Sequence, residues 1–254
     1  MILAIDMGNS NIVIGGIDEK RIYFMERLST DKKKTDLEYA VSIRSVLELS
    51  HVDAGQLEGA ILSSVVPPLN PTITAAVKKV TGLTLMIVGS GMKTGLNIRM
   101  DDPKKVGADL IVDSVAAKAL FPLPIIVIDM GTATTVTAVD KNGDYIGGAI
   151  CPGLRVSLDA IASRTAQLPY IELDEPSSVI GKNTVDSMRS GIMYGNAAMI
   201  DGLIDRMEEE LGEKASIVAT GGIAPFVCRL CRHEITVDDA LLLRGLLILY
   251  RKNR

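Results

Sequence analysis

Two short β-branched runs of the chain end in the same four residues. Residues 1–4 lead into Ile5-Asp6-Met7-Gly8, and residues 125–127 lead into Ile128-Asp129-Met130-Gly131. In both places small hydroxyl or amide residues follow, and a second apolar run begins after them. Apolar runs of this length predict β-strands, and the Asp-x-Gly between them predicts a tight turn. The chain therefore repeats a strand–turn–strand unit, with one copy opening each half.

The rest of the apolar pattern alternates between strands and helices. Thr35 and Glu38 have the spacing of a capping box, Pro71 is placed to begin a helix, and residues 141–144 predict a hairpin turn. We expect further helices over residues 107–120, 185–211 and 241–250 and after Gly222, and strands over residues 60–66, 83–88 and 216–219. Such alternation predicts an α/β architecture. Prolines at 122 and 124 mark a boundary, so we expect two domains, residues 1–119 and 120–254, with a cleft between them.

The composition narrows the class of protein. Of 254 residues, 47% are hydrophobic and 23% charged, as in ordinary globular proteins, and the net charge of −4 does not favour nucleic acid. Asp6 interrupts the first apolar run, which is therefore no signal peptide, and no stretch has the roughly 18 apolar residues of a membrane span. Three cysteines without a framework spacing favour reduced thiols, and we interpret Cys228 and Cys231 as packed thiols rather than a zinc site. We expect a cytoplasmic protein without a membrane partner.

Two common phosphate-binding motifs are absent from the sequence. Residues 181–184 lack the upstream glycine of a Walker A loop, and residues 89–94 lack the last glycine of a dinucleotide fingerprint.

The two Asp-Met-Gly turns offer another way to hold phosphate. Gly8 permits a tight turn in which the backbone N–H groups of residues 9–11 can point at phosphate oxygens. The Asp6 carboxylate can hold a water or a cation that bridges to phosphate, and Thr132 and Thr135 add hydroxyl groups from the other half. Each turn alone would also fit an ordinary hairpin with a capping aspartate. The duplication favours the phosphate-binding role.

A third glycine turn follows the predicted strand over residues 216–219. Thr220-Gly221-Gly222 places glycines between a strand end and a helix, where a flat ligand can approach the backbone closely. Together with the two Asp-Met-Gly turns, this order of motifs resembles the superfamily of acetate and sugar kinases, heat-shock cognate ATPases and actin. The resemblance covers nearly the whole chain. It implies an α/β fold of two related actin/ribonuclease H-like domains with an interdomain cleft.

The middle of the chain gives a narrower resemblance. Residues 94–112, which include Gly107-Ala108-Asp109, are similar to the signature of type III pantothenate kinases, as are residues 6–10, 129–135 and 147–153. This resemblance implies that ATP phosphorylates the primary hydroxyl of pantothenate, the first committed step toward coenzyme A. It also implies Mg²⁺ with the ATP, a monovalent cation (K⁺ or NH₄⁺), and a homodimer.

The same resemblance assigns roles to residues by matching position. Asp109 would accept the proton of the hydroxyl, although a carboxylate at a helix start also suits the helix dipole. Asp129 would hold the monovalent cation. Thr184 would touch pantothenate, and its place before a predicted helix makes it an N-cap candidate as well. The contacts implied for ATP are Asp6, Met7, Gly8, Asn9, Ser10, Asn11, Ile12, Val13 and Thr132, and those for pantothenate are Gly107, Ala108, Asp109, Leu110 and Thr184.

Two positions depart from the family pattern. Leu110 stands where the family usually has arginine, and Met100 stands where it commonly has tyrosine. Both belong to the acid substrate's side of the site, and leucine cannot replace a bidentate guanidinium. Arg99 or Arg155 could meet the pantothenate carboxylate instead. The sequence therefore favours a pantothenate kinase, with a kinase for another small hydroxy acid and a non-enzymatic ATP-binding regulator as the alternatives.

Overall fold

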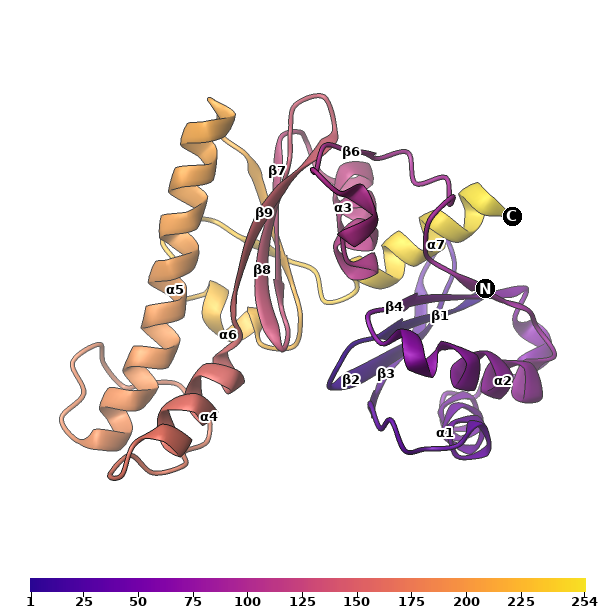
Figure 1. Cartoon of the computed structure of the whole chain (residues 1–254), viewed down its shortest axis with the longest axis horizontal. Helices are drawn as coiled ribbons and strands as arrows, with labels where there is room; N and C mark the ends of the chain where they lie inside the picture. The colour runs from indigo at the N-terminus through magenta and orange to yellow at the C-terminus, as the bar shows by residue number, and fades with distance from the viewer. The chain divides into compact units, whose positions relative to one another are not determined.

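Each copy of the repeated turn lies in its own β-sheet (Figure 1). The computed structural model describes residues 1–254. In it, β1 (Ile2–Met7) pairs antiparallel with β2 (Asn11–Ile17), and β7 (Ile125–Met130) pairs antiparallel with β8 (Ala133–Val139). The predicted strand–turn–strand repeat is therefore confirmed.

The two sheets share one strand order. The first runs β3-β2-β1-β4-β5 and the second runs β11-β10-β7-β8-β9-β6, so that β3, β2, β1, β4 and β5 correspond to β9, β8, β7, β10 and β11. In the first sheet, β3, β2 and β1 pair antiparallel, and β4 and β5 then continue the sheet parallel to β1. The second sheet repeats this pattern, with β9, β8 and β7 antiparallel and with β10 and β11 parallel to β7. The remaining bounds are β3 (Ile22–Ser29), β4 (Gly59–Ser64), β5 (Leu85–Ile87), β6 (Asn97–Ile98), β9 (Asp144–Pro152), β10 (Ser216–Thr220) and β11 (Thr236–Val237).

The first unit combines the first sheet with four helices. These are α1 (Asp36–Leu49), α2 (Asn70–Thr81), α3 (Ala108–Leu120) and α7 (Leu241–Asn253). The predicted capping box is present, because Thr35 N–H donates to Glu38 Oε2 at 2.7 Å and Glu38 N–H donates to Thr35 Oγ1 at 3.3 Å. The apolar faces of α1 and α2 bury the core of this unit against β1, β2 and β4.

The compact units do not follow the chain contiguously. The first comprises residues 1–96, 102–119 and 240–254, and the second comprises residues 97–101 and 120–239. The chain passes from the first unit to the second after residue 119, where we expected a domain boundary. Helix α7, however, belongs to the first unit although it follows the second in sequence. Its Tyr250 hydroxyl donates to Glu58 O at 3.1 Å, and its Arg251 pairs with Glu19 and Glu58 at 2.6 and 2.7 Å. The division of the chain into domains at residue 119 stays a prediction.

The second unit is built around the long helix α5 (Thr184–Leu211), which runs along its sheet (Figure 1). The buried face of α5 packs with β7, β8, α4 (Leu154–Arg164) and α6 (Ala224–Cys228) in one apolar core. The predicted hairpin at residues 141–144 is present, and Gly143 adopts φ 77° there. Cys228 ends α6 and Cys231 follows it, both as free thiols. None of the helices is long and apolar enough to cross a membrane.

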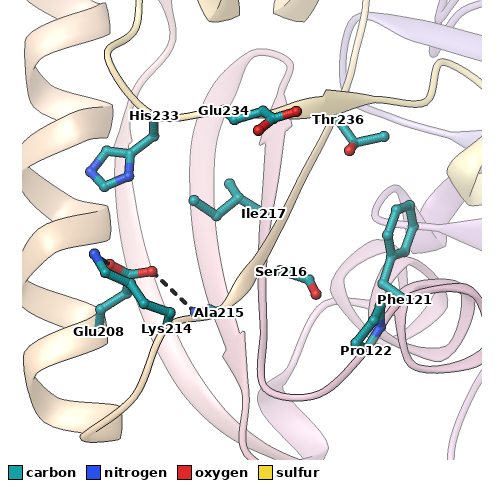
Figure 2. Close-up of a pocket in the computed structure, with 10 residues that line it drawn as sticks. All are labelled: Phe121, Pro122, Glu208, Lys214, Ala215, Ser216, Ile217, His233, Glu234 and Thr236. Carbon is teal, nitrogen blue, oxygen red and sulfur yellow. Dashed lines mark hydrogen bonds and ion pairs between the residues drawn. The ribbon is translucent and has the colours of Figure 1, made fainter.

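A buried carboxylate fastens the end of α5 to β10. Glu208 is 7% exposed; it accepts from Lys214 Nζ at 2.5 Å and from Ala215 N–H at 3.1 Å (Figure 2). Burial raises the pKa of Glu208, but the Lys214 ammonium and the Ala215 N–H outweigh it, so the pKa lies below the ordinary 4.5. Nearby, His233 Nε2 lies 2.8 Å from Asp205 Oδ1. These contacts hold the chain on either side of β10 to α5.

Replacing Glu208 by Ala should lower the free energy of unfolding by about 1–3 kcal/mol, because the Ala215 N–H loses a buried acceptor. The folded-state pKa is depressed, so this contribution is fully present above pH 4.5 and is lost as the pH falls through the lower folded pKa. Urea unfolding at several pH values measures it. Lys214→Ala is the matched control: its side chain is 82% exposed, and it should cost less than about 1 kcal/mol. Equal losses in the two variants would contradict this account.

Candidate functional site

The turn between β1 and β2 is closed by its own backbone and fastened to the end of β3. Gly8 N–H donates to Asn11 O at 2.9 Å. Thr30, just after β3, donates through its hydroxyl to Gly8 O at 2.7 Å and through its N–H to Ser10 O at 3.0 Å. Residues 9–11 are exposed, as a ligand-binding turn requires. Thr30 is a support that the sequence did not indicate, since it follows the turn by some twenty residues.

The side chains within this first motif divide into two groups. Met7 and Ile12 are fully buried in the apolar core of the unit, whereas Asp6 and Val13 are partly exposed. Any contact of Met7 or Ile12 with a ligand must therefore be made by the backbone. Asp6 is in register with Ser63 of the parallel strand β4, at the carboxyl end of both strands.

The second turn is one residue shorter, and α4 begins directly on it. Met130 pairs with Thr134, whereas Met7 pairs with Ile12, and Gly131 N–H donates to Ala133 O at 3.0 Å. Gly153, the N-cap of α4, donates its N–H to Thr132 O at 3.2 Å. A Cβ at Gly153 would lie 2.4 Å from that same oxygen, so only glycine allows this approach. Thr132 is exposed and Asp129 is half-buried.

The third turn lies against the end of β7. β10 runs parallel to β7 with Thr220 in register with Asp129, so both strands end at the same edge of the second sheet. Gly221 has φ +97°, and a Cβ there would lie 2.6 Å from Met130 O. We expected this glycine to let a flat ligand approach the backbone, and that contact stays a prediction. In the structure Gly221 allows the third turn to pack against the backbone at the second turn.

Asp109 stands at the second residue of α3, in the first unit. Its Oδ1 accepts from Leu110 N–H at 2.9 Å. Burial raises the pKa of the Asp109 carboxyl above its ordinary 3.8, although the N–H of Leu110 lowers it in part. A Cβ at Gly107 would lie 2.3 Å from Asp109 Oδ1, so the carboxylate occupies space that only glycine leaves open. A carboxylate that is half-buried and more basic than usual suits a proton acceptor.

Thr184 is the first residue of α5 and not its N-cap. The N-cap is Asn183, whose Oδ1 accepts from Asp186 N–H at 2.9 Å, so our assignment of the cap to Thr184 is wrong by one residue. Asn183 rather than Thr184 caps the helix because its side-chain oxygen reaches the N–H of Asp186, three residues further along the chain. Thr184 lines a hollow of ≈ 650 Å³ together with Lys182 and Ser187.

The two candidate arginines differ in their surroundings. Arg99 Nε pairs with Asp144 Oδ2 at 2.6 Å, and the Asp144 side chain is largely buried. Arg155 lies exposed in the first turn of α4, next to the Thr132 turn. Met100 is 39% exposed.

The structure gathers the predicted site residues into two groups. The first unit holds residues 6–13 and 107–110, and the second unit holds Asp129, Thr132 and Thr184. Within the second unit, Asp129, Thr132 and the Gly221 turn come together at one sheet edge, and Thr184 lies at the start of α5.

Comparison with known proteins relates the whole chain to one family. The sequence model of the type III pantothenate kinase family matches residues 2–206. A type III pantothenate kinase of Halalkalibacterium halodurans is 42% identical over 253 residues, which cover 100% of both chains.

The fold has wider relatives among solved structures. Component A of (R)-2-hydroxyglutaryl-CoA dehydratase from Acidaminococcus fermentans superposes with a TM-score of 0.57, at 18% identity over 98% of this chain and 96% of that one. The ROK hexokinase of Thermus thermophilus gives a TM-score of 0.53, at 11% identity over 98% of both chains. At these identities the likeness is one of fold, and it confirms the expected two-domain α/β class.

Proposed function

The chain belongs to the type III pantothenate kinase family, and from this premise we propose that the Asp109 carboxylate accepts the proton of the pantothenate hydroxyl during phosphorylation. As a member of that family, the protein is a kinase that uses ATP and a divalent metal to phosphorylate pantothenate in coenzyme A biosynthesis. The family thus favours the first of the three functions that the sequence left open.

The proposal rests on the environment of the Asp109 carboxylate. Phosphoryl transfer needs little covalent chemistry from the protein, so a group that orients the attacking hydroxyl and takes its proton contributes directly. Burial makes Asp109 a better base than an exposed aspartate, and its contact with Leu110 N–H fixes one carboxylate oxygen. In this proposal the other oxygen faces the substrate, which Gly107, Ala108 and Leu110 border.

We assign the ATP phosphates to the Asp-Met-Gly turns. In this proposal the exposed residues 9–11 offer N–H groups and hydroxyls, Thr132 adds a hydroxyl, and the buried Met7 and Ile12 take part through their backbone only. Asp6 is placed to hold water or the divalent metal that accompanies ATP, because hard cations prefer oxygen ligands.

The monovalent cation belongs to Asp129 in this proposal. Asp129 is half-buried and Thr132 follows it by three residues in the same motif, so both offer oxygen ligands, which fit K⁺ and also accept hydrogen bonds from NH₄⁺. When bound there, the cation would supply positive charge next to the phosphates.

Thr184 is the pantothenate contact that we propose in the second unit. Its hollow mixes the polar groups of Lys182 and Asn183 with the apolar Met188, a combination that suits a molecule with a carboxylate and a gem-dimethyl carbon. Arg155 is exposed beside the Thr132 turn, whereas Arg99 is ion-paired with Asp144, so we propose Arg155 as the arginine that meets the pantothenate carboxylate.

Val179 and Ile180, five and four residues before Thr184 along the chain, are 62% and 80% exposed, which supports a homodimer with this face covered. Sedimentation equilibrium tests the dimer.

Purified protein should phosphorylate pantothenate with Mg²⁺ and ATP in K⁺ or NH₄⁺ buffer and much more slowly in Na⁺ buffer. Asp129→Asn should remove the difference between the buffers, because the carboxylate that holds the cation loses its charge. Asp159→Asn, an exposed change on α4, is the control and should behave as wild type. Equal rates in Na⁺ and K⁺ would contradict the cation assignment. ATP binding without turnover in any buffer would contradict the substrate assignment.

A further inference from the structure

The C-terminal helix α7 lies between the first sheet and α3. It contacts β1, β2 and β4 (Figure 1). On that side, a Cβ at Gly15 of β2 would lie 2.4 Å from Leu243 Cδ1, and a Cβ at Gly59 of β4 would lie 1.9 Å from Tyr250 Oη. Glycines in the sheet therefore make room for the side chains of α7.

On the opposite side of α7, Gly245 contacts α3. Gly245 follows Leu243 by two positions, a rotation of roughly 200° on a helix of 3.6 residues per turn. A Cβ at Gly245 would lie 2.2 Å from Val112 O and 2.9 Å from Val112 C, both backbone atoms of α3. Glycine weakens the interior of a helix relative to alanine, so the close approach to α3 is the physical reason for its presence here.

The contact lies beside the proposed base. Val112 follows Asp109 by three residues, which is nearly one turn of α3. A side chain that meets another side chain can rotate away, but one that meets backbone must move the helix. A methyl group at Gly245 would therefore shift the first turns of α3.

The end of α7 also holds the loop that precedes α3 in the first unit. Asn253 Oδ1 accepts from Lys93 N–H at 2.8 Å, and Asn253 Nδ2 donates to Lys93 O at 3.0 Å. Lys252 Nζ donates to Thr94 O at 2.9 Å. Lys118 Nζ of α3 donates to Gly95 O of this loop at 3.0 Å, so the loop is a second link between α7 and α3.

We propose that Gly245 is a positioning residue for phosphoryl transfer: by setting the spacing between α7 and α3, it fixes the Asp109 carboxylate relative to the β1–β2 turn of the same unit. This inference rests on the proposed role of Asp109. It gives the C-terminal helix a part in the reaction, although α7 lies far from both phosphate motifs in sequence.

Gly245→Ala should lower kcat by roughly 10- to 100-fold, because a displacement of about 1 Å of a reacting group has effects of this size. The KM for ATP should change little, since the β1–β2 turn keeps its own supports. The acid limb of kcat/KM should move to lower pH, because a shifted α3 exposes Asp109 to water and lets its raised pKa fall toward 3.8.

Leu243→Ala is the matched control on the same helix. Leu243 is buried on the sheet side of α7, against Gly15, so the change destabilises α7 but leaves the contact between α7 and α3 untouched. At a temperature where both variants are folded, it should keep wild-type kcat and the wild-type acid limb. If Gly245→Ala does not fold, Asn253→Ala replaces it, and we expect a smaller loss of kcat, roughly 3- to 10-fold, with the same direction of pH shift.

A double-mutant comparison separates this inference from the proposed function. If Gly245 acts through Asp109, Gly245→Ala should cause no further loss of kcat in an Asp109→Asn background. Full activity of Asp109→Asn would overturn the proposed function itself. A large loss in Asp109→Asn together with wild-type kcat and pH profile in Gly245→Ala, or in Asn253→Ala if that variant is used, would overturn the positioning role alone.

Discussion

Asp109→Asn should lower kcat for pantothenate phosphorylation by roughly 10²- to 10⁴-fold, the range that a positioned general base contributes. Asparagine keeps the size of the side chain and its acceptor oxygen for Leu110 N–H but cannot take a proton at neutral pH. Steady-state kinetics at saturating ATP and pantothenate measure the effect.

The folded state should tolerate this substitution. Burial raises the pKa of Asp109, so its ionised form destabilises the folded state above that pKa, and a neutral amide removes this cost. We expect unchanged ATP affinity and no loss of thermal stability. Asp53→Asn, an exposed change in the same unit, should leave kcat as in wild type. A fully active Asp109→Asn enzyme would exclude Asp109 as the base.

Gly221→Ala should lower the free energy of unfolding by about 2–4 kcal/mol and weaken ATP binding at least roughly 10-fold. Two effects add at this position: the backbone has φ +97°, and a Cβ would meet the O, C and N atoms of Met130 at 2.6–2.8 Å. Because Met130 is backbone of the second turn, the change displaces Asp129 and Thr132 together. Urea unfolding and calorimetric titration with ATP measure the two losses.

Gly212→Ala is the control that separates these two effects. Gly212 also has positive φ, at 75°, but nothing lies within 4 Å of a Cβ there. It should cost about 1 kcal/mol and leave ATP binding intact. If Gly221→Ala costs no more than Gly212→Ala, the close packing of the third turn on Met130 is not important for stability.

The repeat was visible in the sequence because each copy ends a strand with the same four residues. Two copies in one chain imply two sheets of one topology, and the strand orders agree with this. Strand β3 was missed because its charged residues, Glu26 and Arg27, break the apolar alternation that marks a strand. Helix α4 was missed because its start depends on the fit of Gly153 against Thr132, a tertiary contact that no local pattern reveals.

The attachment of α7 could not be predicted for a similar reason. Its amphipathic pattern shows that one face is buried but not which sheet buries it, and the matching glycines, Gly15 and Gly59, lie about two hundred residues earlier. The turns were indicated by their motifs, whereas the roles of Asp109, Leu110 and Thr184 rest on resemblance alone, since none of the three belongs to a chemically distinctive pattern. The cleft between the domains stays a prediction.

The pH dependence of kcat/KM for pantothenate, measured in wild type and in Asp109→Asn, tests the central claim most directly. Titrations that belong to the substrates appear in both enzymes, so the limb that is lost in the variant belongs to Asp109. We predict that wild-type activity falls with decreasing pH through a pKa above 3.8 and that this limb is absent from the variant. An acid limb that is identical in both enzymes would show that another group accepts the proton.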